Sequence, residues 1–394
     1  YALNAETGQL IWRQKADWTP TSRVSGKLTL HDGVAYVPIS NYQEVLNMGG
    51  RTLEFPCCTA RGSVSAFDLY TGERKWKTYT IDERSEFIGL TPNNVNRYGP
   101  SGVTVFSGLT VDEKRSLLYV PTANQQTEPV IPESDAVIAL DMETGAKVWV
   151  KGLAPEQMGF QDVYHLGCEA WVDSERKTCS PLNPKGQGDR DIVSPTILVE
   201  RADGTEVLLT GTKDGMLYAL DPDDEGNILW QTRVGRGGEV GGIEWGFASD
   251  GKNAYTPVLD MDADMKGAGS LTAVDLISGK FVWRVENVEA ECEGKPVPLC
   301  GNAFGLPTTV SNDIVFSGTN DGVLRAYNTK TGNPVWSYNT AHDYKTVNGI
   351  KGYGGGLSYG GPAIVKNRLF VFSGNDYAQF TIPGNVLLMF ELDE

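Results

Sequence analysis

The stretch Ala66-Phe67-Asp68-Leu69-Tyr70-Thr71-Gly72-Glu73-Arg74-Lys75-Trp76 decides the fold, because its pattern occurs six times in the 394 residues of the chain. In every copy an Ala-x-Asp or Ala-x-Asn triplet precedes a glycine, and a tryptophan lies four residues after that glycine. Six of the nine tryptophans occupy this position, in copies at 2–12, 66–76, 139–149, 219–230, 273–283 and 326–336. Successive tryptophans are 64, 73, 81, 53 and 53 residues apart, a period typical of a β-propeller.

Each copy predicts a β-hairpin. The acidic or amide side chain and the glycine form the tight turn, and the tryptophan opens the second strand. Alternating apolar runs upstream add two more strands, which completes the four-stranded content of one blade; examples lie at 34–37, 117–120, 314–316 and 369–372. We count seven blades, and an eighth would need residues upstream of Tyr1 or an irregular insertion. The sequence therefore predicts an all-β fold, one propeller domain over 1–394, and tryptophans packed between neighbouring blades.

Both ends of the sequence interrupt a blade. The chain opens at Tyr1 inside a hairpin, and it closes with the strand-like run 386–393, which lacks a tryptophan partner. We expect a segment upstream of Tyr1 to supply the inner strands of the first blade and the outer strand of the last. Any signal peptide would also lie in that segment.

Composition narrows the class of partner and the compartment. A formal charge of −16 argues against nucleic acid as a partner, and no apolar run is long enough to span a membrane. Acidity of this kind is also typical of a merely soluble surface. The even number of cysteines, in three local couples, suits an oxidising compartment, although spacing alone leaves their connectivity open. The couples are Cys57 with Cys58, Cys168 with Cys179 and Cys292 with Cys300.

The adjacent Cys57 and Cys58 give the sharpest local signal. They are either two buried or separately paired thiols, or a strained vicinal disulfide. Around them the chain resembles the PQQ-dependent (quinoprotein) alcohol dehydrogenases, and within that family the polyvinyl alcohol dehydrogenases. The motifs that carry the resemblance span the whole chain, at 57–64, 76–81, 99–102, 241–246, 346–349 and 383–388.

The resemblance implies that pyrroloquinoline quinone (PQQ) binds between a vicinal disulfide and an aromatic ring. Cys57 and Cys58 match the disulfide, and Phe106 stands where the family usually has a tryptophan. The resemblance also implies an arginine paired with a PQQ carboxylate and a basic residue beside the quinone oxygens. Further cofactor contacts are expected from the motifs at 241–246 and 346–349. These expected cofactor-binding residues are Arg61, Lys213, Trp245 and Asn348, and Lys213 is also expected to act in catalysis.

A calcium ion accompanies PQQ in this family, held by carboxylate and amide oxygens as a hard cation requires. Asn124, in Pro121-Thr122-Ala123-Asn124, matches the amide ligand. Glu44 is the carboxylate candidate, with a match that shifts by up to one residue because an insertion follows it. The alternative for Glu44 is an ordinary solvated charge at a strand end. Local spacing and the implied compartment further predict disulfides between Cys57 and Cys58 and within the other two couples.

The catalytic base is where the chain departs from the family pattern. The family position falls on Gln161, which cannot accept a proton at neutral pH, and Asp162 is the adjacent carboxylate. We expect Asp162 to serve as the base. The alternatives are another carboxylate, such as Glu44 or Glu244, or no functional base at all.

The resemblance implies a periplasmic or secreted enzyme that oxidises an alcohol, such as the secondary hydroxyls of polyvinyl alcohol, with PQQ and calcium. Electrons would pass to a c-type cytochrome, either separate or fused upstream of Tyr1. Two alternatives remain open. One is a non-catalytic propeller scaffold in outer-membrane assembly, and the other is a quinoprotein dehydrogenase for a different alcohol or aldehyde.

Overall fold

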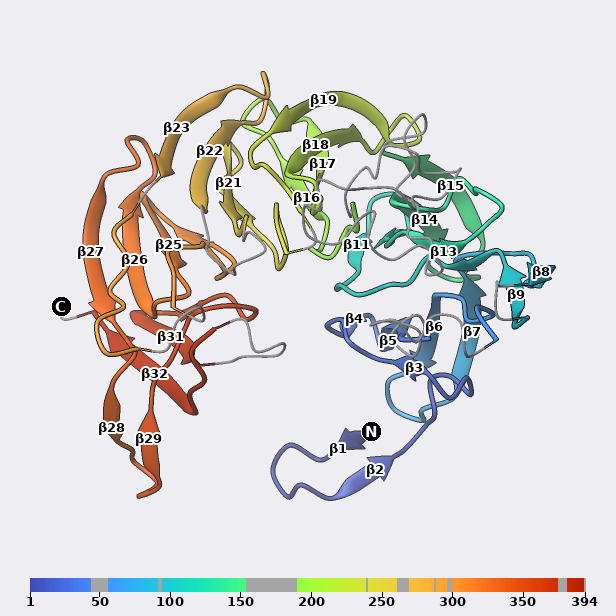
Figure 1. The fold of residues 1–394 in the computed structure, drawn as a ribbon, viewed down its shortest axis with the longest axis horizontal. Helices are drawn as coiled ribbons and strands as arrows, with labels where there is room; N and C mark the ends of the chain where they lie inside the picture. The colour runs from blue at the N-terminus through green and yellow to red at the C-terminus, as the bar shows by residue number, and fades with distance from the viewer. Residues whose placement is uncertain are drawn as a thin grey trace. The chain divides into compact units, whose positions relative to one another are not determined.

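The computed structural model describes residues 1–43, 56–90, 94–153, 190–238, 240–260, 269–286, 288–295, 300–374 and 381–392. The regular secondary structure of these residues consists of antiparallel strands, without a helix (Figure 1). The chain divides into two compact units. The first comprises 1–198 with 222–227, and the second comprises 199–221 with 228–394.

The first unit contains two large sheets and three smaller ribbons. One large sheet has the order β3-β5-β6-β7, with β4 also paired to β5, and the other has the order β11-β12-β14-β15. The strands of the first are β3 (Ser22–Arg23), β4 (Thr29–His31), β5 (Val34–Asn41), β6 (Ser63–Asp68) and β7 (Arg74–Tyr79). Those of the second are β11 (Thr110–Asp112), β12 (Leu117–Pro121), β14 (Ala136–Asp141) and β15 (Lys147–Gly152).

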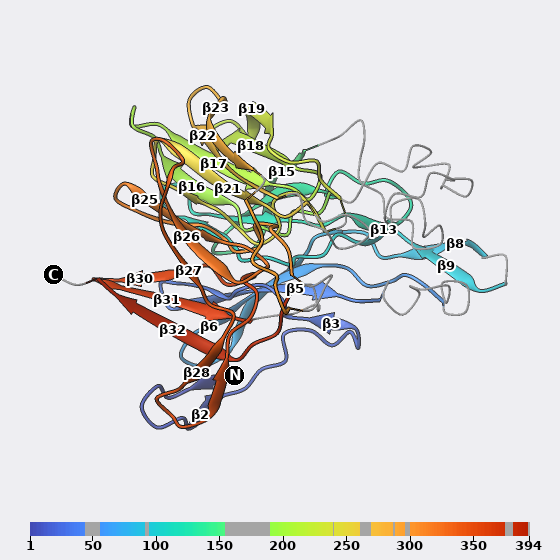
Figure 2. The ribbon, with the colours of Figure 1, turned by 60° about the vertical axis from the view of Figure 1, so that its left-hand side comes forward.

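The three ribbons of this unit each have two strands. They are β1 (Ala2–Leu3) with β2 (Leu10–Trp12), β8 (Glu86–Leu90) with β9 (Asn96–Gly99), and β10 (Ser101–Gly102) with β13 (Gln125–Thr127). The β8–β9 ribbon extends outward past β13 (Figure 2). Its base adjoins the candidate site described below, because β9 lies beside Cys57 and Cys58.

The second unit repeats the four-stranded plan three times. The orders are β16-β17-β18-β19, β20-β21-β22-β23 and β24-β25-β26-β27, followed by the three-stranded sheet β30-β31-β32 and the ribbon β28-β29. The first two sheets consist of β16 (Ile197–Glu200), β17 (Glu206–Gly211), β18 (Met216–Asp221), β19 (Asn227–Arg233), β20 (Ala248–Ser249), β21 (Asn253–Val258), β22 (Ser270–Asp275) and β23 (Phe281–Glu286). The remainder are β24 (Thr309–Ser311), β25 (Ile314–Gly318), β26 (Val323–Asn328), β27 (Pro334–Asn339), β28 (Asp343–Lys345), β29 (Lys351–Tyr353), β30 (Ala363–Val365), β31 (Arg368–Ser373) and β32 (Val386–Glu391).

The hairpin predicted from each repeat is present. The alanine that opens the motif pairs with the tryptophan that closes it, as in Ala66 with Trp76 and Ala139 with Trp149. The same register joins Ala273 to Trp283 and Ala326 to Trp336. Five sheets of at least four strands, the β30–β32 sheet and the β1–β2 hairpin make seven blade-like elements in the described residues, as counted from the sequence.

The tryptophans pack on the hairpin of the next repeat, as predicted. A Cβ placed on Gly72 would lie 2.6 Å from the ring of Trp12, and one on Gly145 would lie 2.6 Å from the ring of Trp76. Trp12 Nε1 also donates to the carbonyl of Leu69, in the same hairpin, at 2.9 Å. The contact recurs for Trp149 on Gly226, Trp230 on Gly279 and Trp283 on Gly332. The glycine is therefore needed twice, for its positive φ and for the flat face that receives the ring.

Candidate functional site

The vicinal cysteines lie in the segment that leads into β6. Cys57 and Cys58 are bonded to each other and both are fully buried. Strand β9 holds them from one side, because Cys58 N–H donates to the carbonyl of Tyr98 at 3.2 Å and Tyr98 N–H donates to that of Cys57 at 2.8 Å. The predicted Cys57–Cys58 disulfide is confirmed, whereas Cys168 and Cys179 lie outside the described residues.

Gln43 holds the same segment from the other side. Its Oε1 accepts the N–H groups of Thr59 and Ala60, each at 2.8 Å, immediately after Cys58. One carboxamide oxygen thereby fixes two consecutive peptides. Sequence reasoning missed Gln43, because nothing in its own neighbourhood indicates that the chain returns to it sixteen residues later.

Asn124 and Phe106 belong to the neighbouring segments of the first unit. Val103 N–H donates to the carbonyl of Asn124 at 3.0 Å, and Gly102 N–H donates to that of Ala60 at 2.9 Å. These bonds connect the predicted amide ligand, through β10, to the chain beside the disulfide. The ring of Phe106 is tilted against Tyr42, with centroids 6.2 Å apart.

The Asn124 side chain is buried, with a hydrogen-bond donor that is unused in the described part of the chain. The residue is 4 % exposed, and its Nδ2 has no hydrogen-bond partner among the described residues. Its backbone N–H is held by Asp191 Oδ1 at 2.8 Å, which fixes the main chain and leaves the carboxamide to turn. A buried amide without a partner loses about 1–3 kcal/mol unless a bound group satisfies it.

No cluster of acidic side chains that could bind a cation together with Asn124 is present in the described part of the chain. No group of three His, Cys, Asp or Glu side chains converges there. Glu44, the predicted carboxylate ligand, lies outside the described residues. The calcium site therefore stays a prediction.

The Arg61 guanidinium already binds backbone carbonyls and an aromatic ring of the protein. Its Nη1 donates to the carbonyls of Ile81, Asp82 and Glu83 at 2.9–3.1 Å, and its guanidinium stacks 4.0 Å from the ring centroid of Tyr79. Burial lowers the pKa of Arg61, and the electrostatic attraction of the nearby Tyr79 partly offsets this decrease. This geometry anchors the turn after β7. The predicted pairing with a PQQ carboxylate stays a prediction for the other guanidinium nitrogens.

Lys213 lies in the turn between β17 and β18 of the second unit. A glycine-rich loop, described at 235–238 and 240–242, packs on its backbone, and Gly238 N–H donates to the carbonyl of Lys213 at 3.2 Å. Buried Asp260 orders this loop, since its carboxylate accepts the N–H groups of Gly237 and Gly242, both at 2.9 Å, and of Arg236 at 2.5 Å. Sequence reasoning did not single out Asp260.

Trp245 and Glu244 follow the same loop. The Trp245 ring packs on Tyr359 with centroids 4.1 Å apart, so the predicted cofactor-binding ring is held in a defined orientation. Glu244, an alternative base, is 4 % exposed, and its Oε1 accepts Gly241 N–H at 3.2 Å. The buried position and this local bond favour a role in holding the loop.

The structure does not support two of the predicted site residues: one is exposed at the tip of a ribbon, and the other lies outside the described residues. Asn348 lies at the tip of the β28–β29 ribbon, where its exposed carboxamide oxygen accepts Thr346 Oγ1 at 2.7 Å and Ile350 N–H at 3.3 Å. These are the bonds of a turn residue, and its cofactor contact stays a prediction. The proposed base Asp162 and its neighbour Gln161 lie outside the described residues.

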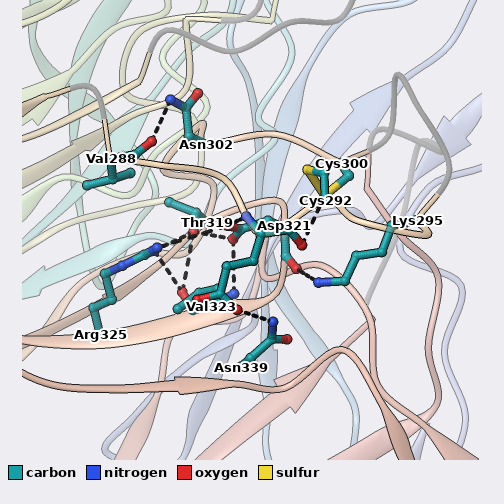
Figure 3. Close-up of a disulfide and its surroundings, with 11 residues drawn as sticks. Val288, Cys292, Lys295, Cys300, Asn302, Thr319, Asp321, Val323, Arg325 and Asn339 are labelled. Atoms are coloured by element: carbon teal, nitrogen blue, oxygen red, sulfur yellow. Dashed lines mark hydrogen bonds and ion pairs between the residues drawn. A yellow bond between two sulfur atoms is a disulfide. The ribbon is translucent and has the colours of Figure 1, made fainter.

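The second confirmed disulfide, Cys292–Cys300, stands beside a buried acidic side chain (Figure 3). Asp321 is fully buried, and its carboxylate accepts Glu291 N–H and Val323 N–H, both at 3.0 Å. Lys295, within the disulfide loop, donates from Nζ to the Asp321 carbonyl at 2.8 Å, and burial lowers the pKa of its amine. The disulfide therefore closes a loop that Glu291 N–H and Lys295 Nζ connect to the buried Asp321.

Comparisons with known proteins agree with this geometry. A family model described as "Glucose/ethanol/alcohol dehydrogenase, beta-propeller domain" matches residues 38–154, and one described as "Outer membrane protein assembly factor BamB" matches residues 213–379. In solved structures, a quinohemoprotein alcohol dehydrogenase of Pseudomonas putida HK5 shares the fold with a TM-score of 0.60, 16% identity and coverage of 94% of this chain and 59% of that one. The fold is thus a β-propeller of PQQ-type repeats.

Curated proteins with similar sequences are alcohol dehydrogenases. A polyvinylalcohol dehydrogenase of Pseudomonas sp is 33% identical over the whole chain, and that of Sphingopyxis sp. (strain 113P3) is 34% identical. The quinohemoprotein alcohol dehydrogenase of Comamonas testosteroni is 24% identical over 85% of the chain and 52% of its own length. Over its whole length the chain is thus similar to polyvinylalcohol dehydrogenases, and over 85% of it to a quinohemoprotein alcohol dehydrogenase. It spans 60% of the length of each of the two polyvinylalcohol dehydrogenases.

Proposed function

We propose that the protein is a PQQ- and calcium-dependent dehydrogenase that oxidises secondary hydroxyl groups, including those of polyvinyl alcohol. The observation that carries the proposal is the buried Cys57–Cys58 disulfide, held between β9 and Gln43 in a chain that is 33% identical to a polyvinylalcohol dehydrogenase. A buried sulfur pair presents a flat, apolar, polarisable surface of the kind that a planar ring can cover.

The residues fit the cofactor in the first unit. Cys57 and Cys58 would contact one face of the quinone, and Phe106 supplies an aromatic face. The carboxamide oxygen of Asn124, with Glu44, would bind the calcium ion. When bound, PQQ supplies the two-electron acceptor and calcium supplies Lewis acidity. For Lys213 and Trp245 the cofactor-binding roles rest on the family resemblance alone.

The chain itself has three tasks in this reaction. It must orient the substrate hydroxyl, exclude water and accept the hydroxyl proton. Asp162 would accept that proton, because a carboxylate near a divalent cation stays ionised at neutral pH. The protein's own contribution is therefore positioning and electrostatics, while the redox chemistry belongs to the cofactor.

The electron acceptor and the compartment complete the proposal. Disulfides persist where the environment is oxidising, which suits a periplasmic or secreted protein. The described residues contain no helix that is long and apolar enough to cross a membrane. A c-type cytochrome is the proposed acceptor, because it can take the two electrons of the reduced cofactor one at a time.

Reconstitution tests the proposal directly. Purified apo-protein should bind PQQ stoichiometrically in the presence of calcium, followed by the quinone absorbance, and should then reduce an artificial dye with polyvinyl alcohol as substrate. Short secondary alcohols serve as the comparison substrates. Failure to bind PQQ would sink the proposal, whereas binding with oxidation of short alcohols alone would replace the polymer as substrate.

One alternative has a specific observation behind it. The model described as an outer membrane protein assembly factor matches 213–379, a longer stretch than the dehydrogenase model. A non-catalytic scaffold would have no need of PQQ. The same reconstitution separates the two, because a scaffold would show neither binding nor turnover.

A further inference from the structure

The repeats place one amide or acid at the same point of five sheets. In five sheets the alanine of the motif pairs with a residue on the preceding strand, and the fifth residue after that partner is Asn or Asp in each case. The pairing residues are Tyr36, Tyr119, Leu209, Tyr255 and Phe316. The equivalent residues that follow are Asn41, Asn124, Asp214, Asp260 and Asp321.

The three aspartates are occupied by their own loops. Asp260 accepts three backbone N–H groups, and Asp321 accepts two. Asp214 accepts the hydroxyl of Thr212, in the same turn. At these positions the side chain is a structural acceptor, and both the geometry and the charge are explained within the protein.

The two asparagines of the first unit differ. Asn41 is fully buried, and its Oδ1 accepts the N–H of Gln43 at 3.1 Å. That bond fixes which end of the carboxamide is oxygen, so the opposite end is the Nδ2 donor. This Nδ2 has no hydrogen-bond partner among the described residues.

The position of Asn41 connects this unsatisfied donor to the candidate site. Two residues later Gln43 binds the peptides that follow Cys58, and the intervening Tyr42 packs on Phe106. The oxygen of Asn41 already accepts one N–H group, so the part of this side chain that is left without a partner among the described residues is the donor. What it offers is a buried N–H for an acceptor oxygen, and an anionic acceptor gives the stronger bond.

We propose that Asn41 Nδ2 donates a hydrogen bond to an oxygen of the bound quinone cofactor, either a carboxylate or a quinone oxygen. This inference rests on the proposed function, and it assigns to the cofactor a residue that the family motifs did not indicate. Asn124 differs because no described residue fixes its carboxamide, which can turn its oxygen to a cation.

Two substitutions at this one position distinguish a ligand from a turn former. Asn41→Asp keeps the oxygen that accepts Gln43 N–H, and the fold carries Asp at three equivalent positions, but it replaces the donor with a negative charge. Asn41→Ser keeps a shorter acceptor for the turn and replaces the Nδ2 donor by a hydroxyl that lies one bond closer to the main chain, without adding charge. A purely structural residue would give wild-type behaviour for Asp and a defect for Ser.

The measurement is the PQQ dissociation constant at saturating calcium, from titration of the quinone absorbance. Loss of a hydrogen bond to a charged group should weaken PQQ binding about tenfold to a hundredfold in Asn41→Ser, and further in Asn41→Asp. Thermal unfolding of each apo-variant shows whether the fold is retained. PQQ affinity unchanged in Asn41→Asp overturns this inference alone, whereas a wild-type protein that binds no PQQ overturns it together with the proposed function.

Discussion

At the scale of single residues, identical positions in the repeat have acquired different chemistry. Asp260 and Asp321 satisfy backbone donors, while Asn124 and Asn41 each leave a buried Nδ2 without a partner in the described chain. Family resemblance located Asn124 because it stands in a recognisable motif. Gln43 and Asp260 escaped sequence reasoning because their partners are peptides of other segments of the chain, and Asn41 escaped it because no motif marks the residue.

The proton acceptor gives the first prediction at this scale. Asp162→Asn keeps the size of the side chain and removes its basicity, so turnover should fall about 10²–10⁴-fold while PQQ stays bound. Gln161→Asp is the matched variant, since it restores a carboxylate at the family position and should keep or raise turnover. The measurement is the dye-linked rate at full cofactor loading. Normal turnover by Asp162→Asn would move the base to Glu44 or Glu244.

The buried pair of Asp17 and Lys77 gives a prediction for pH. Burial alone would raise the pKa of Asp17, but bonds from Lys77 and from Thr19 lower it from 3.8 to about 2. The ionised carboxylate therefore stabilises the fold above pH ~4, and this contribution disappears as the pH falls through about 2. It amounts to about 2 kcal/mol at pH 7 and about half of that at pH 3.

Denaturant unfolding of Asp17→Asn at the two pH values checks this. The variant should be about 2 kcal/mol less stable than wild type at pH 7, with the difference smaller at pH 3. Lys77→Met is the companion variant, because it removes the same pair from the other side. A stability difference that does not change between pH 7 and pH 3 would contradict the ionised pair.

At the scale of elements, the hairpin of one repeat and the tryptophan of the preceding repeat form one interlocking contact. The regular spacing of glycine and tryptophan can be recognised in the sequence, so the strands and the packing of the rings could be predicted. The path of the segment that carries Cys57 and Cys58 could not. Its bonds to β9 and Gln43 join residues far apart in sequence that share no period.

Substitutions at two glycines can distinguish the effect of backbone strain from the effect of ring packing. Gly8 and Gly279 have nearly the same φ, +70° and +67°, but a Cβ on Gly8 has no atom within 4 Å and one on Gly279 would lie 2.7 Å from the Trp230 ring. Gly8→Ala should destabilise the protein by about 1 kcal/mol, through the positive φ alone. Gly279→Ala should add a further 1–3 kcal/mol, roughly the usual effect of overpacking. Equal losses of unfolding free energy would refute the packing role of the glycine.

At the scale of the whole molecule, charge is the property that bears on partners. The chain has 50 acidic and 34 Lys or Arg residues, a formal charge of −16. An all-β propeller was predictable from the repeat period, and the structure and the comparisons confirm it. Substrate loops could not be predicted in the same way, because residues outside the repeat follow no period.

The net charge predicts how the proposed cytochrome partner would associate. A basic c-type cytochrome should be reduced rapidly at low ionic strength, and the second-order rate constant should fall as salt is added, since screening shortens the range of the attraction. An acidic cytochrome of similar potential is the control and should show the opposite salt dependence. Stopped-flow reduction with substrate-loaded enzyme measures both. A rate independent of salt would exclude steering by the acidic surface.

The contact between a tryptophan and the following glycine also bears on how such chains can change length during evolution. Each junction needs a ring from one repeat and a hairpin from the next, and the same two parts recur along the chain. A gene duplication that copies one whole repeat therefore creates a new junction of the existing kind, whichever repeat it copies. A deletion that begins and ends at the same point of two repeats likewise leaves no ring without its hairpin. Lineages descended from one ancestral repeat could thus differ in blade number by whole units, while insertions of other lengths would be confined to the loops.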